Sequence, residues 1–107
     1  MPYLTLDKIE YPGAISSVAE RFASENGLNY MFHADDIPHW FVLGKGKRIT
    51  IGAVMEKNQE YLYLLPSQST SRRALIGKKK KFSLKNLTQS ELEEILHQTL
   101  GEVWNSF

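Results

Sequence analysis

The chain has 107 residues, of which 42% are hydrophobic and 23% are charged; this fits one domain, residues 1–107, and argues against wholesale disorder. Its net charge is +1 and it has no cysteine, so disulfides, thiol nucleophiles and thiolate metal sites are excluded. We expect a cytoplasmic protein without membrane contact, because the longest apolar run (61–65) is far too short to span a bilayer and the N-terminus has no signal-peptide pattern.

The first quarter of the chain predicts a strand followed by a helix. Residues 3–11 alternate loosely between apolar and polar side chains, as strands do, until Pro12-Gly13 interrupts the pattern. Apolar side chains then recur at the spacing of one helix face: Ile15, Val18, Ala19 and Phe22. Asn26-Gly27 supplies a left-handed residue of the kind that ends a helix.

The middle of the chain predicts a series of short strands. Four ranges are rich in β-branched and aromatic residues and are bounded by turn sequences: 30–33, 40–43, 48–55 and 61–65. Gly44-Lys45-Gly46-Lys47 connects the second and third ranges as a hairpin, because glycine adopts positive φ without strain. Residues 74–76 and 82–84 are expected to form a last, irregular hairpin or edge strand.

The C-terminal segment predicts a capped amphipathic helix. Thr88 and Glu91 match a capping box, in which the side chain of each accepts a hydrogen bond from the backbone amide of the other. Leu87 and Leu92 lie where a hydrophobic staple places its pair of apolar residues. One face of the helix is apolar: Leu92, Ile95, Leu96, Leu100, Val103 and Phe107.

Together these elements predict an α+β fold. We expect the order β-α-β-β-β-(β)-α, an antiparallel meander sheet with two helices on one face, because the connections after residue 30 are too short for parallel crossovers. The expected core consists of apolar side chains from the helices and strands: Ile15, Val18, Phe22, Phe32, Phe41, Leu43, Ile49, Ile51, Leu62, Leu64, Leu92, Leu96 and Val103.

Basic residues gather near the C-terminus. Residues 72–85 hold seven basic and no acidic side chains, whereas the rest of the chain holds six basic and twelve acidic ones. A positive segment on an acidic body attracts phosphates or acidic surfaces. The candidate polyanion-binding residues are those of this segment and those of the hairpin: Arg72, Arg73, Lys78, Lys79, Lys80, Lys81 and Lys85, with Lys45, Lys47 and Arg48. Trp40, Tyr61 or Tyr63 would stack on bases if they share a face with these residues.

Two structural explanations of the basic segment remain open. Lysines on an edge strand prevent edge-to-edge aggregation, and the segment could dock on the acidic face of the C-terminal helix.

The order of elements over residues 14–106, a helix, three strands, basic residues and a second helix, is similar in outline to the double-stranded RNA-binding domain. In this chain, however, the lysine run ends about seven residues before the helix cap instead of lying at the helix start. Compared with that domain, this chain also has an extra strand before the first helix and an extra segment at residues 66–84.

A second candidate site lies between the first two short strands. His33, Asp35, Asp36 and His39 combine imidazole and carboxylate ligands, and His97 would add another if the fold brought it near. Their spacing matches no standard metal signature, and two aspartates before Ile-Pro are also ordinary turn chemistry. Phosphate-loop and nucleophile-elbow motifs do not occur. We therefore expect no cofactor, no metal and no catalytic residue, with metal binding in this turn as an open alternative.

Three functions follow from these patterns. The first is a small non-catalytic binding module whose basic segment contacts nucleic acid or another polyanion, such as an acidic protein. The alternative is a protein–protein interaction, regulatory or assembly subunit, a homodimer included, with no nucleic-acid role. The third is an enzyme or ligand-binding protein that uses the residues at 33–39. The protein–protein alternative is favoured by aromatic side chains beyond the needs of a small core: Tyr30, Trp40, Tyr61, Tyr63 and Trp104.

Overall fold

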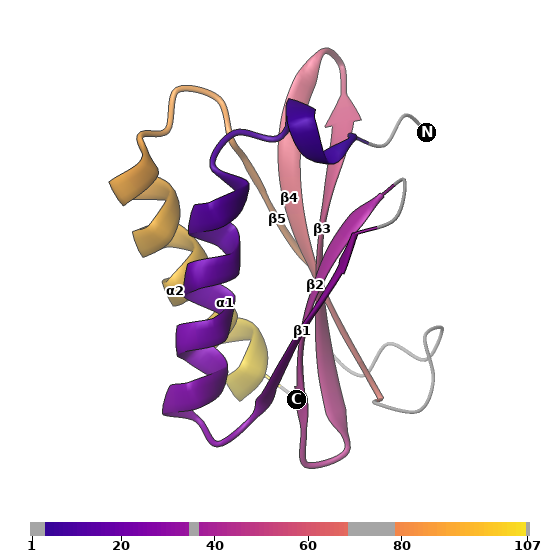
Figure 1. The fold of residues 1–107 in the computed structure, drawn as a ribbon, viewed down its shortest axis with the longest axis vertical. Helices are drawn as coiled ribbons and strands as arrows, with labels where there is room; N and C mark the ends of the chain where they lie inside the picture. The colour runs from indigo at the N-terminus through magenta and orange to yellow at the C-terminus, as the bar shows by residue number, and fades with distance from the viewer. Residues whose placement is uncertain (1–3, 35–36, 69–78, 107) are drawn as a thin grey trace.

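A computed structural model describes residues 4–34, 37–68 and 79–106 and contains one sheet and two long helices (Figure 1). A short 3-10 turn, η1, precedes the first helix. The elements in chain order are η1 (Leu6–Lys8), α1 (Pro12–Glu25), β1 (Asn29–Ala34), β2 (Pro38–Gly44), β3 (Lys47–Glu56), β4 (Gln59–Gln68), β5 (Lys80–Ser83) and α2 (Gln89–Asn105).

The strands form an antiparallel meander in which the spatial order β1-β2-β3-β4-β5 is also the chain order. Two of the connections are two-residue turns in which both residues have positive φ: Lys45-Gly46 (53° and 76°) and Lys57-Asn58 (50° and 65°). Turns of this kind match the right-handed twist of the strands that they join. The hairpin predicted at 44–47 is therefore confirmed, and glycine takes its second position.

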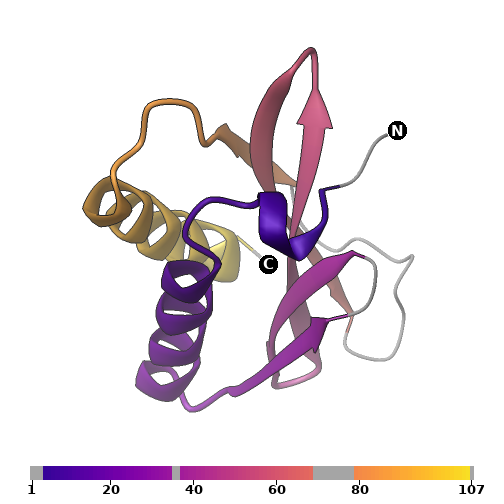
Figure 2. The same ribbon diagram turned by 45° about the horizontal axis from the view of Figure 1, so that its top comes forward.

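Both helices lie on the same face of the sheet, as two views of the ribbon show (Figures 1 and 2). They pack against each other as well, because His97 Nε2 of α2 lies 3.0 Å from Glu25 Oε1 of α1. The core fills the space between helices and sheet. Its largest fully buried side chains come from every layer: Ile15, Val18, Trp40, Val42, Ile49, Ile51, Leu62, Leu64, Leu92, Leu96, Leu100 and Val103.

The predicted cap of the second helix is present. Thr88 Oγ1 accepts a hydrogen bond from the Glu91 amide at 3.2 Å, and Glu91 Oε1 accepts one from the Thr88 amide at 3.1 Å. The hydrogen bond from the Thr88 amide lowers the pKa of Glu91. The capping box thus satisfies two amide donors that would otherwise lack an intrahelical partner and defines where α2 begins.

The predicted fold class is confirmed, but the predicted strand at 3–11 is wrong. That segment contains η1 and a left-handed Tyr11 (φ 57°) before α1. Leu4 and Ile9 are buried there, whereas Leu6 and Tyr11 are exposed, so the apolar residues do not share one strand face. Five strands follow α1: four match the predicted ranges 30–33, 40–43, 48–55 and 61–65, and the fifth, Lys80–Ser83, overlaps the edge strand expected at 82–84. Residues 74–76 lie outside the described residues.

The predicted core is wrong at three positions, all in β1 and β2. Phe41 and Leu43 are only half-buried, because in β2 the inward positions belong to Trp40 and Val42. The indole nitrogen of Trp40 donates to Ser16 Oγ at 2.7 Å, so helix α1 satisfies the polar atom of this buried ring. Phe32 is 41% exposed, because β1 is an edge strand. None of the helices within the described ranges is long and apolar enough to cross a membrane.

Candidate ligand-binding surface on the sheet

The face of the sheet opposite the helices carries aromatic and polar side chains side by side. Along a strand, alternate side chains point to opposite faces. Since Trp40 and Val42 of β2 point into the core, His39 and Phe41 point away from it. We call this second side the open face. The strand register places on it, from β3, β4 and β5, Arg48, Thr50, Gly52, Val54, Glu56, Tyr61, Tyr63, Leu65 and Lys81.

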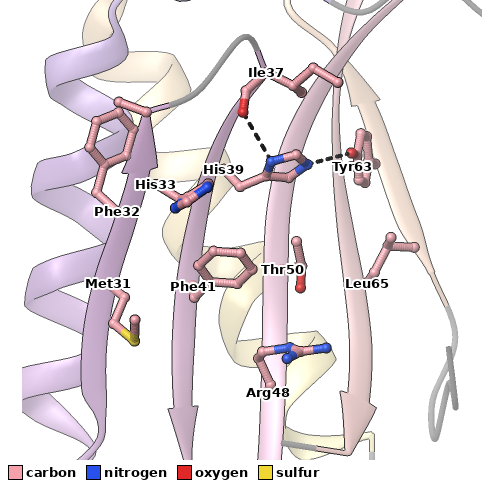
Figure 3. A pocket seen from close by; sticks show the side chains of 11 residues that line it. Met31, Phe32, His33, Ile37, His39, Phe41, Arg48, Thr50, Tyr63 and Leu65 are labelled. Carbon is pink, nitrogen blue, oxygen red and sulfur yellow. Dashed lines mark hydrogen bonds between the residues drawn. The ribbon is translucent and has the colours of Figure 1, made fainter. Parts of the chain in front are cut away.

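Four residues of the open face form a row across the sheet: His39, Gly52, Tyr63 and Lys81 are register partners. Gly52 is required in this row because a Cβ there would overlap the hydroxyl end of the Tyr63 ring. The Tyr63 ring therefore crosses over β3 toward β2. Its hydroxyl lies 3.5 Å from His39 Nε2 (Figure 3).

His39 is held from both ring nitrogens. Its Nδ1 lies 3.1 Å from the carbonyl oxygen of Ile37, which can only accept a hydrogen bond. Nδ1 must therefore carry the proton of a neutral ring, which leaves Nε2 to accept from the Tyr63 hydroxyl. The Ile37 carbonyl thus sets the tautomer, and Tyr63, for whose ring Gly52 leaves space, helps to hold the imidazole in position.

A hollow of about 910 Å³ lies on the open face beside this row. Figure 3 shows the ring of Phe41 at its centre, with the His39–Tyr63 pair on one side and Arg48 on the other. The lining is mixed. Its apolar part includes Met31, Ile37, Phe41 and Leu65, and its polar part includes His33, His39, Arg48, Thr50 and Tyr63. Concave surfaces with an apolar floor and a few polar groups are typical ligand sites.

The centre of the hollow places positive charge next to an aromatic ring. The guanidinium carbon of Arg48 lies 5.9 Å from the Phe41 ring centroid, and Arg48 Nη2 donates to Ser67 Oγ at 3.2 Å. The imidazole of His39 is nearly parallel to the Phe41 ring, with centroids 6.1 Å apart. A planar anionic ligand would therefore find both an aromatic surface and a cation here.

Two lysines of the basic segment lie over the tyrosines of β4. The Lys79 ammonium is 5.3 Å from the Tyr63 ring centroid, and the Lys81 ammonium is 4.8 Å from that of Tyr61; both distances are typical of cation–π contacts. The open face therefore continues from the hollow to the β5 edge as a row of aromatic rings with cations above them.

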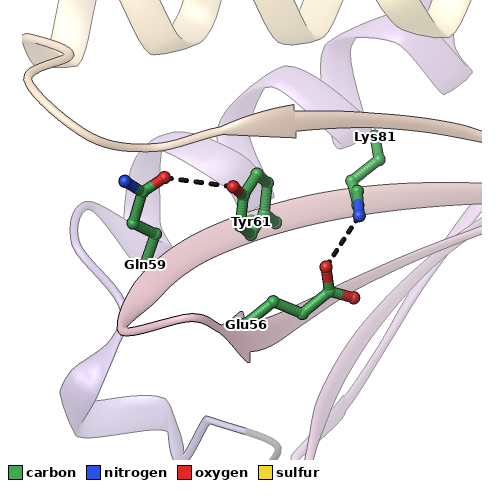
Figure 4. Close-up of polar contacts among 4 residues, drawn as sticks. All are labelled: Glu56, Gln59, Tyr61 and Lys81. Atoms are coloured by element: carbon green, nitrogen blue, oxygen red, sulfur yellow. Dashed lines mark hydrogen bonds and ion pairs between the residues drawn. The ribbon is translucent and has the colours of Figure 1, made fainter.

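Lys81 also binds the one carboxylate that the register places on the open face. Its Nζ donates to Glu56 Oε2 at 2.8 Å (Figure 4). This hydrogen bond lowers the pKa of Glu56 and raises the pKa of Lys81. Both side chains are about one-third exposed, 31% and 38%. Water and salt therefore weaken the pair, and another anion can compete for the lysine.

The predicted basic hairpin does not form one patch. Arg48 points to the open face, but Lys47 lies on the helix side, with its ammonium 5.4 Å from the Trp104 ring of α2. Neighbouring residues of a strand face opposite ways, so a run of basic residues cannot stay together on a sheet. Lys45 occupies the turn and is exposed. Trp104 packs against the core, which accounts for one aromatic residue that the sequence assigned to an outside contact.

The predicted basic segment is only partly described. Lys79 and Lys81 lie on the open face, whereas Lys80 and Lys85 are exposed residues for which strand alternation and position indicate other directions. Arg72, Arg73 and Lys78 lie outside the described residues. The docking of this segment on the acidic face of α2 is not what the described lysines show, because Lys81 pairs with Glu56 of β3.

The turn at 33–39 is also only partly described. Asp35 and Asp36 lie outside the described residues, and His97 is on the helix side with Glu25 as its partner. Within residues 4–34, 37–68 and 79–106, no group of three or more His, Cys, Asp or Glu side chains could hold a metal ion. His33 and His39 instead line the hollow.

Sequence reasoning missed Phe41, Thr50 and Leu65 as members of a surface site, because each was read as core or left unassigned. The signal that could have found Phe41 is the alternation of side chains in β2. Trp40 and Val42 are the buried pair, so Phe41 between them faces the other side of the sheet, but this conclusion requires the inward face to be assigned correctly.

Comparison with known proteins found no protein-family model, curated protein or solved structure that matches the chain.

Proposed function

We propose that the protein is a non-catalytic binding module that holds single-stranded nucleic acid on the open face of its sheet. The observation that carries the proposal is the gathering of three cations, Arg48, Lys79 and Lys81, among aromatic rings on that one face. Cations neutralise phosphates, and aromatic rings stack on bases. A surface that offers both is suited to a strand that exposes both.

An unpaired strand fits this face better than a duplex. A duplex hides the flat surfaces of its bases, so the half-buried ring of Phe41 in the hollow would find no stacking partner. On the helix side, the described residues show no comparable group of cations over aromatic rings. Lys47 is the cation that contacts a ring there, and it is paired with Trp104 beside the core.

The ion pair of Lys81 does not oppose the proposal. A lysine segment neutralised wholly by the protein's own carboxylates could not bind a polyanion. In the described part of the segment, residues 79–85, the ion pair found is that between Lys81 and Glu56. A partly exposed pair is screened by water, and a phosphate can take the place of the carboxylate.

The test is binding of a fluorescein-labelled oligothymidylate of about twelve nucleotides, within the span that one small domain covers. Three phosphate contacts to a single strand predict that affinity falls about 20-fold between 50 and 200 mM salt. In the double variant Lys79→Ala/Lys81→Ala, one contact remains, and the same change in salt is expected to weaken binding only about threefold.

The control removes two equal charges elsewhere. Lys8 in η1 and Arg21 on the outer side of α1 are exposed, and Lys8→Ala/Arg21→Ala is expected to keep the steep salt dependence. The proposal is wrong if the oligonucleotide does not bind at the lower salt concentration, or if both double variants behave alike.

A protein partner is the second candidate, and edge strand β1 favours it. Met31 and Phe32 are 56% and 41% exposed on an unpaired sheet edge. Unpaired edges that carry exposed apolar side chains accept a further strand. Light scattering of the protein at increasing concentration tests self-association. Phe32→Lys is expected to abolish any dimer, and a monomer at all concentrations removes the homodimer version.

A further inference from the structure

We infer that the hollow around Phe41 receives one unpaired base of the bound strand, while Arg48 binds the phosphate next to it. This inference rests on the proposed function and makes it more specific. It assigns base contact to one place on the open face and backbone contact to the residues around that place.

The shape of the surface favours this division. Tyr61 and Tyr63 each have a lysine ammonium over the ring, at 4.8 and 5.3 Å from the centroid, so phosphates are the natural ligands along β5. Phe41 also has a cation near its ring, since the Arg48 guanidinium lies 5.9 Å from its centroid, but Phe41 stands at the centre of a hollow of about 910 Å³, large enough for a base and its sugar. The hollow is therefore the part of the face where a base can leave the strand and be enclosed.

The chemistry of the lining suits a base. Phe41 and Leu65 offer apolar contact to its flat surface, while Thr50 can both donate and accept a hydrogen bond at its edge. On the far side, Tyr63 and His39 hold each other at 3.5 Å, which keeps that wall in a fixed position. A preformed wall and floor reduce the ordering that binding requires.

Arg48 lines the hollow on the side of Phe41 opposite the His39–Tyr63 pair (Figure 3). Its guanidinium lies 5.9 Å from the Phe41 ring and is held by Ser67, a buried neighbour on β4. A planar guanidinium held in this way can bind a phosphate with two of its donors. A base against Phe41 thus has the Arg48 cation within reach of its own phosphate, while Lys79 and Lys81 are available to other phosphates of the strand beside Tyr63 and Tyr61.

The first experiment separates base contact from backbone contact. An oligothymidylate and an abasic oligomer of equal length carry the same phosphates, and only the first has bases. We expect the oligothymidylate to bind roughly 5- to 150-fold more tightly, the range for loss of one stacked base. Phe41→Ala should remove most of that ratio and Phe41→Tyr should keep it. Lys79→Ala/Lys81→Ala should weaken both ligands by the same factor.

The second experiment needs no variant that changes the face. The chain has three methionines, and two of them lie on opposite sides of the sheet: Met31 lines the hollow and Met55 packs against the core. With 13C-methyl-methionine labelling, the ring current of a bound base should shift the Met31 methyl signal and leave that of Met55 unchanged. The abasic oligomer should shift neither.

The outcomes distinguish the inference from the function on which it rests. Equal affinity for the two oligomers with a static Met31 signal would overturn the base site and leave backbone binding on the open face intact. Failure of both oligomers to bind at low salt would overturn the proposed function and the base site together. A Phe41→Ala variant that is folded by circular dichroism and keeps the full affinity ratio would also overturn the base site.

Discussion

The two faces of the sheet are built from the same strands but have different chemistry. On the helix side, successive inward residues are aliphatic or aromatic and fully buried: Trp40, Val42, Ile49, Ile51, Leu62 and Leu64. On the open face, their immediate neighbours include an imidazole, a guanidinium and two hydroxyl groups: His39, Arg48, Thr50 and Tyr63. Along each strand, residues that stabilise the core therefore alternate with residues that are available for ligand binding.

This difference teaches that substitutions on the two sides should have separable effects. Removal of buried apolar atoms costs the transfer free energy of those atoms and leaves a cavity. The half-buried side chains of the open face, such as Phe41 and Leu65, lose less, because part of each already faces solvent. We therefore expect stability to depend mainly on the helix side and ligand affinity mainly on the open face.

The largest expected effect compares two leucines on the two sides of the sheet. Leu96→Ala on α2 removes a fully buried side chain and should lower the free energy of unfolding by about 2–5 kcal/mol. Leu65→Ala makes the same chemical change at a half-buried position of the open face and should cost well under half as much. Urea denaturation of both variants measures the two values, and equal losses would contradict the separation of the faces.

Gly52 is expected to be the exception to that rule. Gly52→Ala forces a methyl group against the Tyr63 ring and should cost about 1–3 kcal/mol of unfolding free energy, although the residue belongs to the open face. In a Tyr63→Ala background the methyl group has space, and alanine is better than glycine in a strand, so the same change should be neutral or stabilising. A double-mutant cycle by denaturant unfolding tests this, and an unchanged cost in the second background would exclude the clash with Tyr63.

The open face can be made more positive by removal of its carboxylate. Glu56→Gln releases the Lys81 ammonium and should tighten oligothymidylate binding about two- to fivefold at low salt, the range for an exposed ion pair. Glu102→Gln on α2 changes the net charge equally on the opposite side of the protein. Its affinity should stay close to that of the unchanged chain, and equal tightening in both variants would mean that only net charge matters.

The smallest expected effect concerns the helix that covers the other face. The Thr88 amide lowers the pKa of Glu91, so its contribution to stability is present above the unfolded pKa and is lost as the pH falls through the lower folded pKa. The difference in unfolding free energy between the unchanged chain and Glu91→Gln should therefore shrink below about pH 4.5. Urea melts of both proteins at several pH values measure this difference, and a difference that stays constant through this range would contradict the role of the ionised Glu91 carboxylate in the capping box.

The covered side of this protein could be predicted from the sequence better than the open face. The apolar face of the C-terminal helix, which includes Val103, and the capping box at Thr88 are local patterns. Local patterns can be recognised in a sequence before the fold is known. The strand at 3–11 was wrong because Leu4 and Ile9 are buried while the residues between them turn, which alternation alone cannot reveal.

The candidate site could not be predicted because it depends on strand pairing. Lys81 and Glu56 are neighbours only because β5 pairs with β4 beside β3, and Tyr63 reaches His39 only because Gly52 leaves space for its ring. Phe41 was assigned to the core because Trp40 beside it is equally apolar, and periodicity does not decide which of two adjacent aromatic residues faces inward.

The meander has a consequence for the order in which the chain can fold. Each strand pairs with its neighbour in sequence, so the hairpins can form early from residues that are close along the chain. The helices differ, because Glu25 and His97, which join α1 to α2, are 72 positions apart. Docking of α2 closes this long loop and adds four buried side chains to the core: Leu92, Leu96, Leu100 and Val103. We therefore expect a nascent chain that lacks α2 to contain fluctuating hairpins, and cooperative folding to begin only once Val103 has been added.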